Sequence, residues 1–527
     1  MKKIICLAAL LIASISHAQK NQSVRNWFNL DATKDSFNGV STERAYEELL
    51  KGKKSTTVIV GVLDSGVDYL HEDLKDVMWK NPGEIAGNGI DDDKNGYIDD
   101  IHGWNFIGNK DGKNVSDDNL EVTRVYKKLN DKFKGKTEKD FTSKEDKKEF
   151  KNYLIVKEDF EKQVADNEAQ INQYKFIKEG VQSIIDKIKK QKGNDHLINE
   201  EDLKNFEASD DTEKRVKMLV LYQAKAGKSP EKLIEELNDA LKNFETSNFD
   251  LENNSRQIVG DNYEDVNEKY YGNPDCKGPG ASHGTHVAGI IAAARQNNIG
   301  MDGIADNVKI MAVRCVPNGD ERDKDIANAI RYAVDNGAQI LNMSFGKKYS
   351  PYKKAVDEAV KYAESKGVFI IHAAGNSSED IDQIVHYPCK KLLNGKNAPN
   401  FIDVGALSWK KNDEIVAPFS NYGEKNVDLF APGVDIYSTI PENQYASYSG
   451  TSMAAPVVAG VAAVLKSYFP ELSPKQLKKI LIKSSVKTYK YYKVIKPGTK
   501  DEVIEFKSLT KNGGIVNLYE AVKMASE

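Results

Sequence analysis

The chain has 527 residues, a formal net charge of −4 at pH 7 and 40% hydrophobic residues, which is enough for two to four domains. Its 75 basic residues are offset by 79 acidic ones, so there is no basic excess of the kind that predicts a nucleic-acid partner. No apolar run is long enough to span a bilayer, so no transmembrane segment is expected.

The N-terminus has the pattern of a secretory signal peptide. Residues 1–3 carry two lysines, residues 4–15 are largely apolar, and residues 16–18 form a small-x-small cleavage site. Cleavage near Ala18 predicts an exported protein that is periplasmic, attached to the cell surface or secreted. It also removes Cys6, which leaves an odd number of cysteines and at most one internal disulfide.

Two of the remaining cysteines lie in loop-like sequence. Cys276 and Cys389 are therefore the pair that we expect if a disulfide forms. Cys315 lies in an apolar strand-like run instead and is predicted to be buried and inert.

A short helix is predicted at residues 39–52 and a buried parallel strand at residues 57–63. The strand prediction rests on a continuous run of β-branched and apolar residues. This run ends in Asp64-Ser65-Gly66. Because loops at the carboxyl ends of parallel strands are where α/β proteins place their chemistry, Asp64 is a candidate catalytic carboxylate.

An acidic loop follows between residues 88 and 100. Its spacing matches the first nine positions of a calcium-binding loop, with the ligands and the turn glycine at Asp91, Asp93, Asn95, Gly96, Tyr97 and Asp99. The twelfth position is His102 rather than a bidentate Glu, which argues against an EF-hand and leaves Asp99 or Asp100 to close the site. A solvated acidic turn is the alternative. Carboxylates this close repel one another without a cation, so we predict structural calcium.

The composition changes between residues 116 and 255, where Lys, Glu, Asp and Asn dominate. Apolar residues at spacings of mostly three, four or seven predict a long amphipathic helix that ends at Gly193 and contains Leu154, Phe160, Val164, Ile171, Tyr174, Val181, Ile184 and Ile188. Shorter helical patterns follow at residues 216–222 and 233–244. We predict a mainly helical insertion of two to four helices. The alternative, a disordered charged linker, is disfavoured by the regular spacing.

A histidine-containing helix start lies beyond the insertion, at residues 282–289. It makes His283 a candidate catalytic base. His283 and His286 are also spaced as two zinc ligands would be, but no Cys or acidic residue lies nearby in the sequence to complete such a site.

From residue 309 onward, strand and helix patterns alternate. Strands are predicted at residues 309–316, 339–343, 368–372, 401–407 and 427–430, and helices at residues 324–336, 352–366, 453–465 and 475–483. A hairpin at residues 489–506 and a short helix complete the pattern. The alternation predicts an α/β fold with a mostly parallel sheet and helices on both faces.

Three polar residues stand within or just after these elements. His372 lies inside an apolar strand and is predicted to be a packed core histidine, whereas Asn376 follows that strand in a Gly-Asn turn. Ser452 stands between small residues and an apolar helix, where free N–H groups favour negative charge. A serine there is ordinarily a helix cap. With a histidine and a carboxylate available as base and orienting group, we predict that it is a nucleophile.

Four motifs, in this order, resemble the signature motifs of the subtilisin-like serine proteases: Asp64-Ser65-Gly66, the run from His283 to Gly289, Ala373-Ala374-Gly375-Asn376 and the run from Gly450 to Pro456. The resemblance implies a subtilisin-like three-layer fold, in which residues 19–115 and 256–527 form the catalytic domain and residues 116–255 are an insertion. It also implies an Asp64, His283 and Ser452 triad for peptide-bond hydrolysis, with Asn376 as the oxyanion donor.

The resemblance further implies how a protein or peptide substrate would bind. Relatives hold an extended substrate along two backbone edges, which here would be residues 316–319 and Ser344-Phe345-Gly346. A roomy pocket for the side chain before the scissile bond would be lined by Ala373, Ala374 and Gly375. The charged residues 318–322 are expected to form a rim that alters the outer subsites. Asp73 and the turn at Asn297 resemble parts of a second calcium site of the family.

Two other classes of function fit parts of the sequence. The same triad would attack esters, so an acyl hydrolase is the second enzymatic interpretation. The non-enzymatic one is a surface protein that binds a partner through its insertion, with the protease fold as a scaffold. The complete set of four motifs argues against this non-enzymatic interpretation.

The insertion itself has a predicted role. Its ends must return to nearly the same place, because Asp64 and His283, 219 positions apart, must both reach Ser452, and a helical hairpin satisfies this requirement. The stretch before the first strand has no room for an inhibitory propeptide of the usual size. We therefore hypothesise that the insertion restricts access to the cleft.

Overall fold

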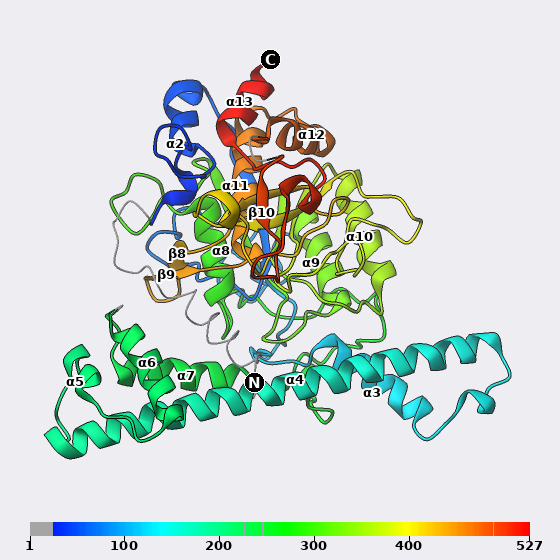
Figure 1. The fold of residues 1–527 in the computed structure, drawn as a ribbon. Coiled ribbons are helices and arrows are strands. Elements are labelled where there is room, and N and C mark those ends of the chain that lie inside the picture. The colour runs from blue at the N-terminus through cyan, green and yellow to red at the C-terminus, as the bar shows by residue number, and fades with distance from the viewer. Residues whose placement is uncertain (1–24, 226, 245–246, 488–489) are drawn as a thin grey trace. The chain divides into compact units, whose positions relative to one another are not determined.

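The structure is a computed structural model that describes residues 25–225, 227–244, 247–487 and 490–527 (Figure 1). The predicted signal peptide lies outside these residues. The described chain divides into two compact units, a larger one formed by residues 25–121 with Asn253–Glu527, and a smaller one that spans Val122–Glu252. The predicted insertion limits, 116 and 255, fall within the larger unit, because the Ser255 hydroxyl donates to Asp118 there and Asp118 pairs with Arg322.

The larger unit is built on a seven-stranded sheet in the order β2-β3-β1-β4-β5-β6-β7, in which every pairing is parallel. The strands are β1 (Val58–Asp64), β2 (Gly103–Asn105), β3 (Val308–Arg314), β4 (Ile340–Met343), β5 (Phe369–Ala373), β6 (Phe401–Leu407) and β7 (Leu429–Pro432). Six of them lie within two residues of predicted strands. The edge strand β2 was not predicted, since three residues are too few to show a period.

Helices cover both faces of this sheet (Figure 1). The core on one face contains α8 (Ser282–Ala292) and α11 (Thr451–Tyr468), and the core on the other contains α9 (Asp323–Asp335) and α10 (Lys353–Ser365). Successive side chains of β1 point to opposite faces of the sheet, so Val60 and Val62 pack in the first core and Leu63 packs in the second. The three layers confirm the predicted α/β fold.

The buried helix α11 contains a proline, Pro456, in its second turn. Proline has no N–H to bond to the carbonyl four residues earlier, which is that of Ser452. The hydroxyl of Ser344 donates to this carbonyl instead, at 2.9 Å. By length and composition α11 could cross a membrane, but 83% of its 18-residue window is buried inside the protein. It is therefore the central core helix of the larger unit.

The remaining elements come from the N-terminal and C-terminal parts of this unit, and α13 (Leu518–Ser526) packs against α2 (Thr42–Ala45). The predicted N-terminal helix consists of α2 (Thr42–Ala45) and a π-helical turn over Tyr46–Leu50. The C-terminal elements are α12 (Pro474–Ser484), the antiparallel pair β10 (Lys493–Ile495) and β11 (Val503–Glu505), and α13 (Leu518–Ser526), all at predicted places.

One hairpin was not predicted, that of β8 (Ile436–Ile440) and β9 (Gln444–Tyr448), which packs on α8. Three residues, Pro441, Glu442 and Asn443, connect the two strands, and the last two have positive φ. Glutamate is not one of the residues that mark such a turn in a sequence, so this turn was missed.

The smaller unit is organised around α4 (Lys144–Lys192), a helix of 49 residues that starts at the capping residue Ser143. Within the described residues there are five α-helices rather than the predicted two to four; the others are α3 (Glu121–Phe133), α5 (Glu200–Asn205), α6 (Asp211–Lys225) and α7 (Pro230–Phe244). The six residues of α5 are too few for a periodic signal. For α3 the apolar spacing was present and was overlooked.

Each end of α4 has its own core. At one end Phe150, Tyr153 and Phe160 pack with aromatic residues of α3, and at the other Val181 and Ile184 join a cluster with α5, α6 and α7. The predicted apolar stripe was wrong at Leu154, which is 47% exposed. The buried side of the helix there follows Phe150 and Tyr153 instead.

Candidate active site

A carboxylate and an imidazole meet at the carboxyl end of β1. Asp64 is its last residue and is buried, and one of its oxygens accepts from the Ser65 N–H and from Nδ1 of His283, each at 2.7 Å. Burial disfavours a charged imidazole, but the charge of Asp64 and this hydrogen bond outweigh it and raise the pKa of His283 above its usual 6.5. The His283 side chain remains 39% exposed, so its other nitrogen is accessible.

Two small residues allow this close approach. A Cβ on Gly284 would stand 2.2 Å from the Gly66 carbonyl oxygen, so α8 can lie against the end of β1 only with glycine there. Gly66 has a φ of 116°, and a Cβ on it would meet the carbonyl of Lys277 at 2.0 Å. The glycines of both motifs therefore serve packing at the site.

Arg314 braces the same loop and was not predicted to have a role. This buried residue of β3 donates to the carbonyls of Ser65 and Val115 and to the side chain of Asn105. Burial lowers the pKa of Arg314 to about 10. An arginine inside an apolar strand next to Asp64 was a signal that could have identified it.

Ser452 is the second residue of α11, where helix N–H groups have no intrahelical acceptor. Its hydroxyl donates to the carbonyl of Ser344 at 3.1 Å. Ser344 follows β4 directly, as Asp64 ends β1, and β4 and β1 are paired with Leu63 opposite Met343. The pair of Asp64 with His283 and the pair of Ser344 with Ser452 therefore lie at the same edge of the sheet.

The amide of Asn376 is held in one orientation. Its oxygen accepts from the N–H of Thr451 at 2.8 Å and from the hydroxyl of Thr451 at 2.9 Å. The Thr451 hydroxyl in turn accepts from the N–H of Gly375 at 3.0 Å. Asn376 is exposed, and no described residue accepts a hydrogen bond from its NH₂ group. Thr451 is the partner that the sequence did not reveal.

The backbone at residues 344–346, the predicted substrate edge, is hydrogen-bonded to other parts of the protein on one of its two sides. The carbonyl of Phe345 accepts from Nε2 of His372, whose Nδ1 bonds to Asp403, and Lys347 pairs with Tyr387. His372 is thus a packed core histidine, as predicted, and it fixes this segment. Strand alternation turns Ser344 and Gly346 to the opposite side, where no described residue pairs with the Gly346 backbone.

The second predicted edge differs from expectation. The N–H and carbonyl of Asn318 pair with Ser116 and Asp118, whereas no described residue pairs with the backbone of Gly319. The expected charged rim was wrong for Glu321 and Arg322. Both are buried, because Arg322 forms an ion pair with Asp118 and the Glu321 carbonyl accepts from Lys347.

The predicted pocket residues form a fixed wall next to Asn376. Ala373 and Ala374 are buried, and the carbonyl of Ala374 accepts from Asn421 at 2.9 Å. Gly375 has a φ of 104°, and a Cβ on it would meet the Asn421 amide at 2.4 Å. Only glycine fits this wall.

The zinc alternative for His283 and His286 has no support among the described residues. His286 is fully buried, bonds to the carbonyl of Ala446 and stacks on Tyr448 with ring centroids 4.4 Å apart. Burial lowers its pKa to about 3. His286 is therefore a structural residue that fixes the hairpin of β8 and β9 to α8.

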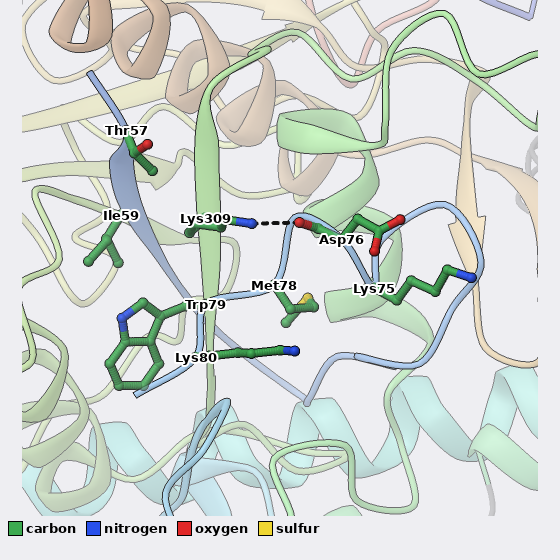
Figure 2. Close-up of a pocket in the computed structure, with 8 residues that line it drawn as sticks. All are labelled: Thr57, Ile59, Lys75, Asp76, Met78, Trp79, Lys80 and Lys309. Atoms are coloured by element: carbon green, nitrogen blue, oxygen red, sulfur yellow. Dashed lines mark hydrogen bonds between the residues drawn. The ribbon is translucent and has the colours of Figure 1, made fainter. Parts of the chain in front are cut away.

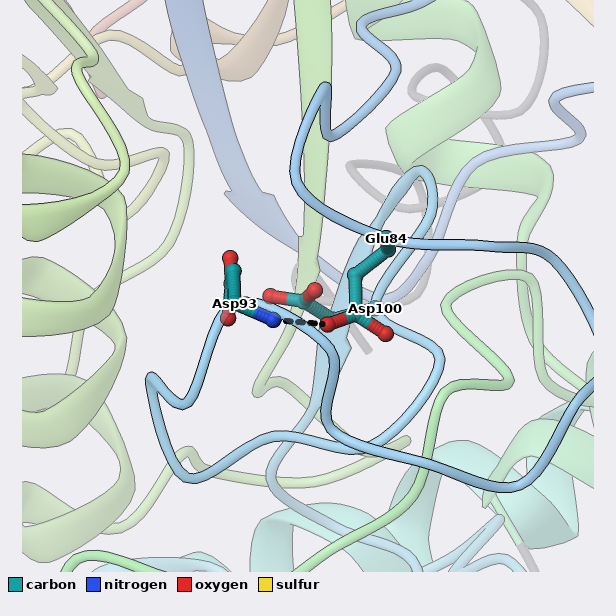
Figure 3. A group of neighbouring side chains, drawn as sticks. All are labelled: Glu84, Asp93 and Asp100. Atoms are coloured by element: carbon teal, nitrogen blue, oxygen red, sulfur yellow. Dashed lines mark hydrogen bonds between the residues drawn. The ribbon is translucent and has the colours of Figure 1, made fainter.

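The acidic loop brings together a different set of carboxylates from the predicted one. Within the described residues, Glu84, Asp93 and Asp100 offer oxygens that lie within 4.8 Å of one another (Figure 3). Asp99 is turned away and accepts from the N–H groups of Gly87 and Gly89. The sequence pattern located the loop but could not show that Glu84 reaches it.

The other predicted ligands of this loop serve its turns. Asp91 accepts from the N–H groups of Asn95 and Gly96, while the Asn95 oxygen accepts from the N–H of Tyr97. The Asn95 NH₂ group donates to Asp93 and Asp100. Burial raises the pKa of Asp100 to about 6.

Asp73 and Asn297, the predicted second calcium site, do come together. The Asn297 NH₂ donates to buried Asp73 at 2.6 Å, and the Asn297 oxygen accepts from the N–H of Ile299. Burial also raises the pKa of Asp73. In this arrangement the amide presents its nitrogen, not its oxygen, to the carboxylate.

The three cysteines in the described part of the chain are free thiols, so the expected pair of Cys276 and Cys389 does not form. Cys315 is buried, as predicted. Cys276 is buried too, and burial raises its pKa to about 12. The loop-like sequence around Cys276 concealed its burial against the Asp64 loop.

A pocket of about 410 Å³ lies elsewhere on the larger unit (Figure 2). It is lined by residues at the start of β1 and β3, among them Thr57, Ile59 and Lys309, whose ammonium donates to the carbonyl of Asp76. These positions are at the opposite end of β1 from Asp64. This pocket is separate from the candidate active site.

The larger unit thus has the organisation of an α/β serine hydrolase, with carboxylate, imidazole, hydroxyl and amide at the carboxyl edge of a parallel sheet. The profile of the subtilase family, peptidase S8, matches residues 55–513, and the chain belongs to this family.

Individual relatives match shorter parts of the chain. A thermophilic serine proteinase of Bacillus sp. (strain AK1) is 44% identical over 187 residues, which are 35% of this chain and 43% of the relative. Subtilisin DY of Bacillus licheniformis is 39% identical over 201 residues, 38% of this chain and 68% of the relative. A solved protease structure from Pseudoalteromonas arctica covers 48% of this chain and 74% of its own, with 29% identity and a TM-score of 0.37.

Proposed function

We propose that this protein is an exported serine endopeptidase in which Ser452 is the nucleophile, His283 the general base and acid, and Asp64 the residue that orients the imidazole. The 2.7 Å bond between His283 Nδ1 and Asp64 carries the proposal. It places the Nδ1 proton toward the carboxylate, so that Nε2 of neutral His283 is the acceptor for the Ser452 proton.

The chemical steps follow from these roles. Ser452 turns from the Ser344 carbonyl to His283, gives its proton to Nε2 and attacks the peptide carbonyl carbon. The imidazolium formed is stabilised by buried Asp64 and returns the proton to the departing amine. Water then attacks the acyl-enzyme with His283 again as base, and the Ser452 hydroxyl is restored.

The negative charge of each tetrahedral intermediate would be bound by two donors. The NH₂ of Asn376 is one and the N–H of Ser452, at the start of α11, is the other. The hydrogen bonds from Thr451 support this assignment, because they fix the Asn376 oxygen away from the reacting carbonyl. A preorganised donor needs no reorientation during the reaction.

Labelling with a fluorophosphonate tests the proposal directly. The probe should modify the mature protein once, and peptide mapping should place the label on Ser452. Paired peptide and ester substrates would then separate an endopeptidase from a general acyl hydrolase. A label on another serine, or none on a protein that cleaves peptides, would exclude this mechanism.

We also propose that the acidic loop binds calcium through Glu84, Asp93 and Asp100. Their oxygens are the ligand type that calcium prefers, and their convergence supports the site. Bound calcium would supply structural charge neutralisation there. The chemistry at Ser452 does not involve it.

Calcium should stabilise the folded protein by about 2.7 kcal/mol at a hundredfold excess over Kd, because it binds only the folded state. Chelation should therefore lower Tm in thermal unfolding followed by circular dichroism. Asp93→Asn should remove the calcium effect, whereas the matched control Asp99→Asn should retain it, since Asp99 bonds elsewhere. The site would be contradicted if chelator left Tm unchanged, or if Asp93→Asn and Asp99→Asn lost the calcium-dependent stabilisation equally.

The insertion remains a proposed gate. Supporting this, the segment that leads into it is bonded to both candidate substrate edges: Asp118 pairs with Asn318, and Glu121 forms a buried ion pair with Lys347, next to Gly346. Because Asp118, Glu121 and Ser255 belong to the larger unit, a deletion must spare them.

Replacing residues 122–252 by a short Gly/Ser bridge should increase kcat/KM for a folded protein substrate relative to a short peptide. Access to the cleft is then limited only by the larger unit. Fluorophosphonate titration of Ser452 gives the concentration of intact active sites, by which each rate is divided. If the folded deletion variant keeps the parent ratio of the two rates, the insertion is not a gate.

A further inference from the structure

A chain of three ionisable side chains lies beside the Gly375 wall. Lys348 donates to one carboxylate oxygen of Glu379 at 2.7 Å, and the other oxygen bonds to Nε2 of His386 at 2.7 Å. The His386 side chain is only 12% exposed. None of these residues has a role in the triad or the oxyanion donors.

His386 stands between the two segments that would flank a bound substrate. A Cβ on Gly375 would lie 3.8 Å from its Nδ1, so this nitrogen lies next to Gly375, one of the residues of the predicted pocket wall. The next residue, Tyr387, pairs with Lys347, and a Cβ on Gly346 would lie 3.2 Å from the Tyr387 carbonyl. His386 therefore lies between the segments at Gly346 and Gly375.

The surroundings fix which nitrogen carries the proton. Glu379 is an acceptor, and its pKa is lowered because the bonds from Lys348 and His386 outweigh its burial, so His386 donates to it from Nε2. Burial lowers the pKa of His386 despite Glu379, with Lys348 and His372 acting in the same direction. At neutral pH its Nδ1 is thus an unprotonated acceptor, and no described residue donates to it.

Asn421 holds this arrangement rigid. Its oxygen accepts from the N–H groups of Ser377 and Glu379, and its NH₂ donates to the carbonyl of Ala374. The wall at Ala374 and the carboxylate that orients His386 are therefore fixed by one buried side chain. Such preorganisation is what a hydrogen-bonding specificity pocket needs.

We propose that His386 determines specificity for the substrate residue before the scissile bond, P1, and that Nδ1 accepts a hydrogen bond from a P1 amide or hydroxyl. The inference rests on the proposed peptidase function. It departs from the expectation of a merely roomy apolar pocket. The substrate class is peptides with Gln, Asn, Ser or Thr at P1, in preference to apolar residues of equal size.

Peptides that differ only at P1, Gln against Met, test the proposal. One hydrogen bond to a largely buried acceptor predicts a kcat/KM ratio of about tenfold in favour of Gln. His386→Asn keeps an amide oxygen near the position of Nδ1 and should keep the ratio. His386→Gln keeps only the group that faces Glu379 and should bring the ratio to about one. The matched control His196→Gln makes the same substitution at a similar Nε2 pair, with Asp202 in the smaller unit, and should leave the ratio unchanged.

Two results would overturn the proposal. The first is a ratio of kcat/KM for the Gln and Met peptides near one in the parent protein, a measurement that needs no variant and therefore no folding control. The second is a ratio that stays the same in His386→Gln. Fluorophosphonate titration of Ser452 normalises each rate to competent sites. If neither peptide is cleaved and Ser452 is not labelled, the proposed function itself has failed. Cleavage of both peptides at equal rates refutes only the role of His386.

Discussion

Replacing Ser452 with alanine is expected to lower kcat by about 10⁶, the order of loss measured for a subtilisin triad serine. The variant should fold normally, because the hydroxyl makes one partly exposed bond, to the Ser344 carbonyl at 3.1 Å. Residual catalysis would come from Asn376 and substrate binding alone. Burst-phase and steady-state assays on a peptide ester measure the loss.

The triad should also behave as one unit. His283→Ala is expected to cost about as much as Ser452→Ala, and Asp64→Ala on the order of 10⁴, with no further loss in combination. Ser449→Ala is the matched control in the same loop, since Ser449 only accepts from the N–H of Asp435. Additive losses, or peptide cleavage that survives in Ser452→Ala, would show that another group is the nucleophile.

The sheet could be predicted from sequence because its strands are buried on both faces. In β1 the pattern from Val58 to Leu63 has no polar position, as expected for a central parallel strand. The same reasoning fails at the margins. The strand β2 is three residues long, and the hairpin of β8 and β9 turns on a glutamate with positive φ.

The residues proposed to act directly could be located in the sequence, whereas the residues that hold them in place could not. Asp64, His283, Asn376 and Ser452 lie in short motifs with distinctive small neighbours, which survive in a sequence as fixed spacings. The Ser344 hydroxyl donates to the Ser452 carbonyl, which has no N–H partner in the helix because Pro456 stands four residues later. Ser344 and Pro456 are 112 positions apart, so no local sequence pattern contains this dependence.

The acidic loop at residues 84–100 illustrates the same limit in another form. Sequence spacing gives the order of oxygens along a loop but not the direction of each side chain. Asp99 has the expected spacing, yet it bonds to Gly87 and Gly89, while Glu84 joins Asp93 from outside the pattern. Direction depends on backbone N–H groups that become available only when the loop folds.

Replacing Asn376 with alanine is expected to lower kcat by about 10² to 10³, with KM nearly unchanged, the effect of removing one oxyanion donor in subtilisin. As the proposed oxyanion donor, the NH₂ group would meet negative charge only in the transition state, so its loss should leave ground-state binding intact. Steady-state kinetics on a peptide amide separates kcat from KM.

Stability gives the necessary control for this variant. Asn376→Ala removes an acceptor for the N–H and hydroxyl of Thr451, but Gly375 still donates to that hydroxyl, so Tm should fall little. Asn394→Ala removes a comparable acceptor, that of the Lys396 N–H, in an exposed turn, and it should leave both Tm and kcat close to the parent values. A rise in KM at constant kcat would assign Asn376 to substrate binding. Unchanged kinetics would leave the N–H of Ser452 as the oxyanion donor.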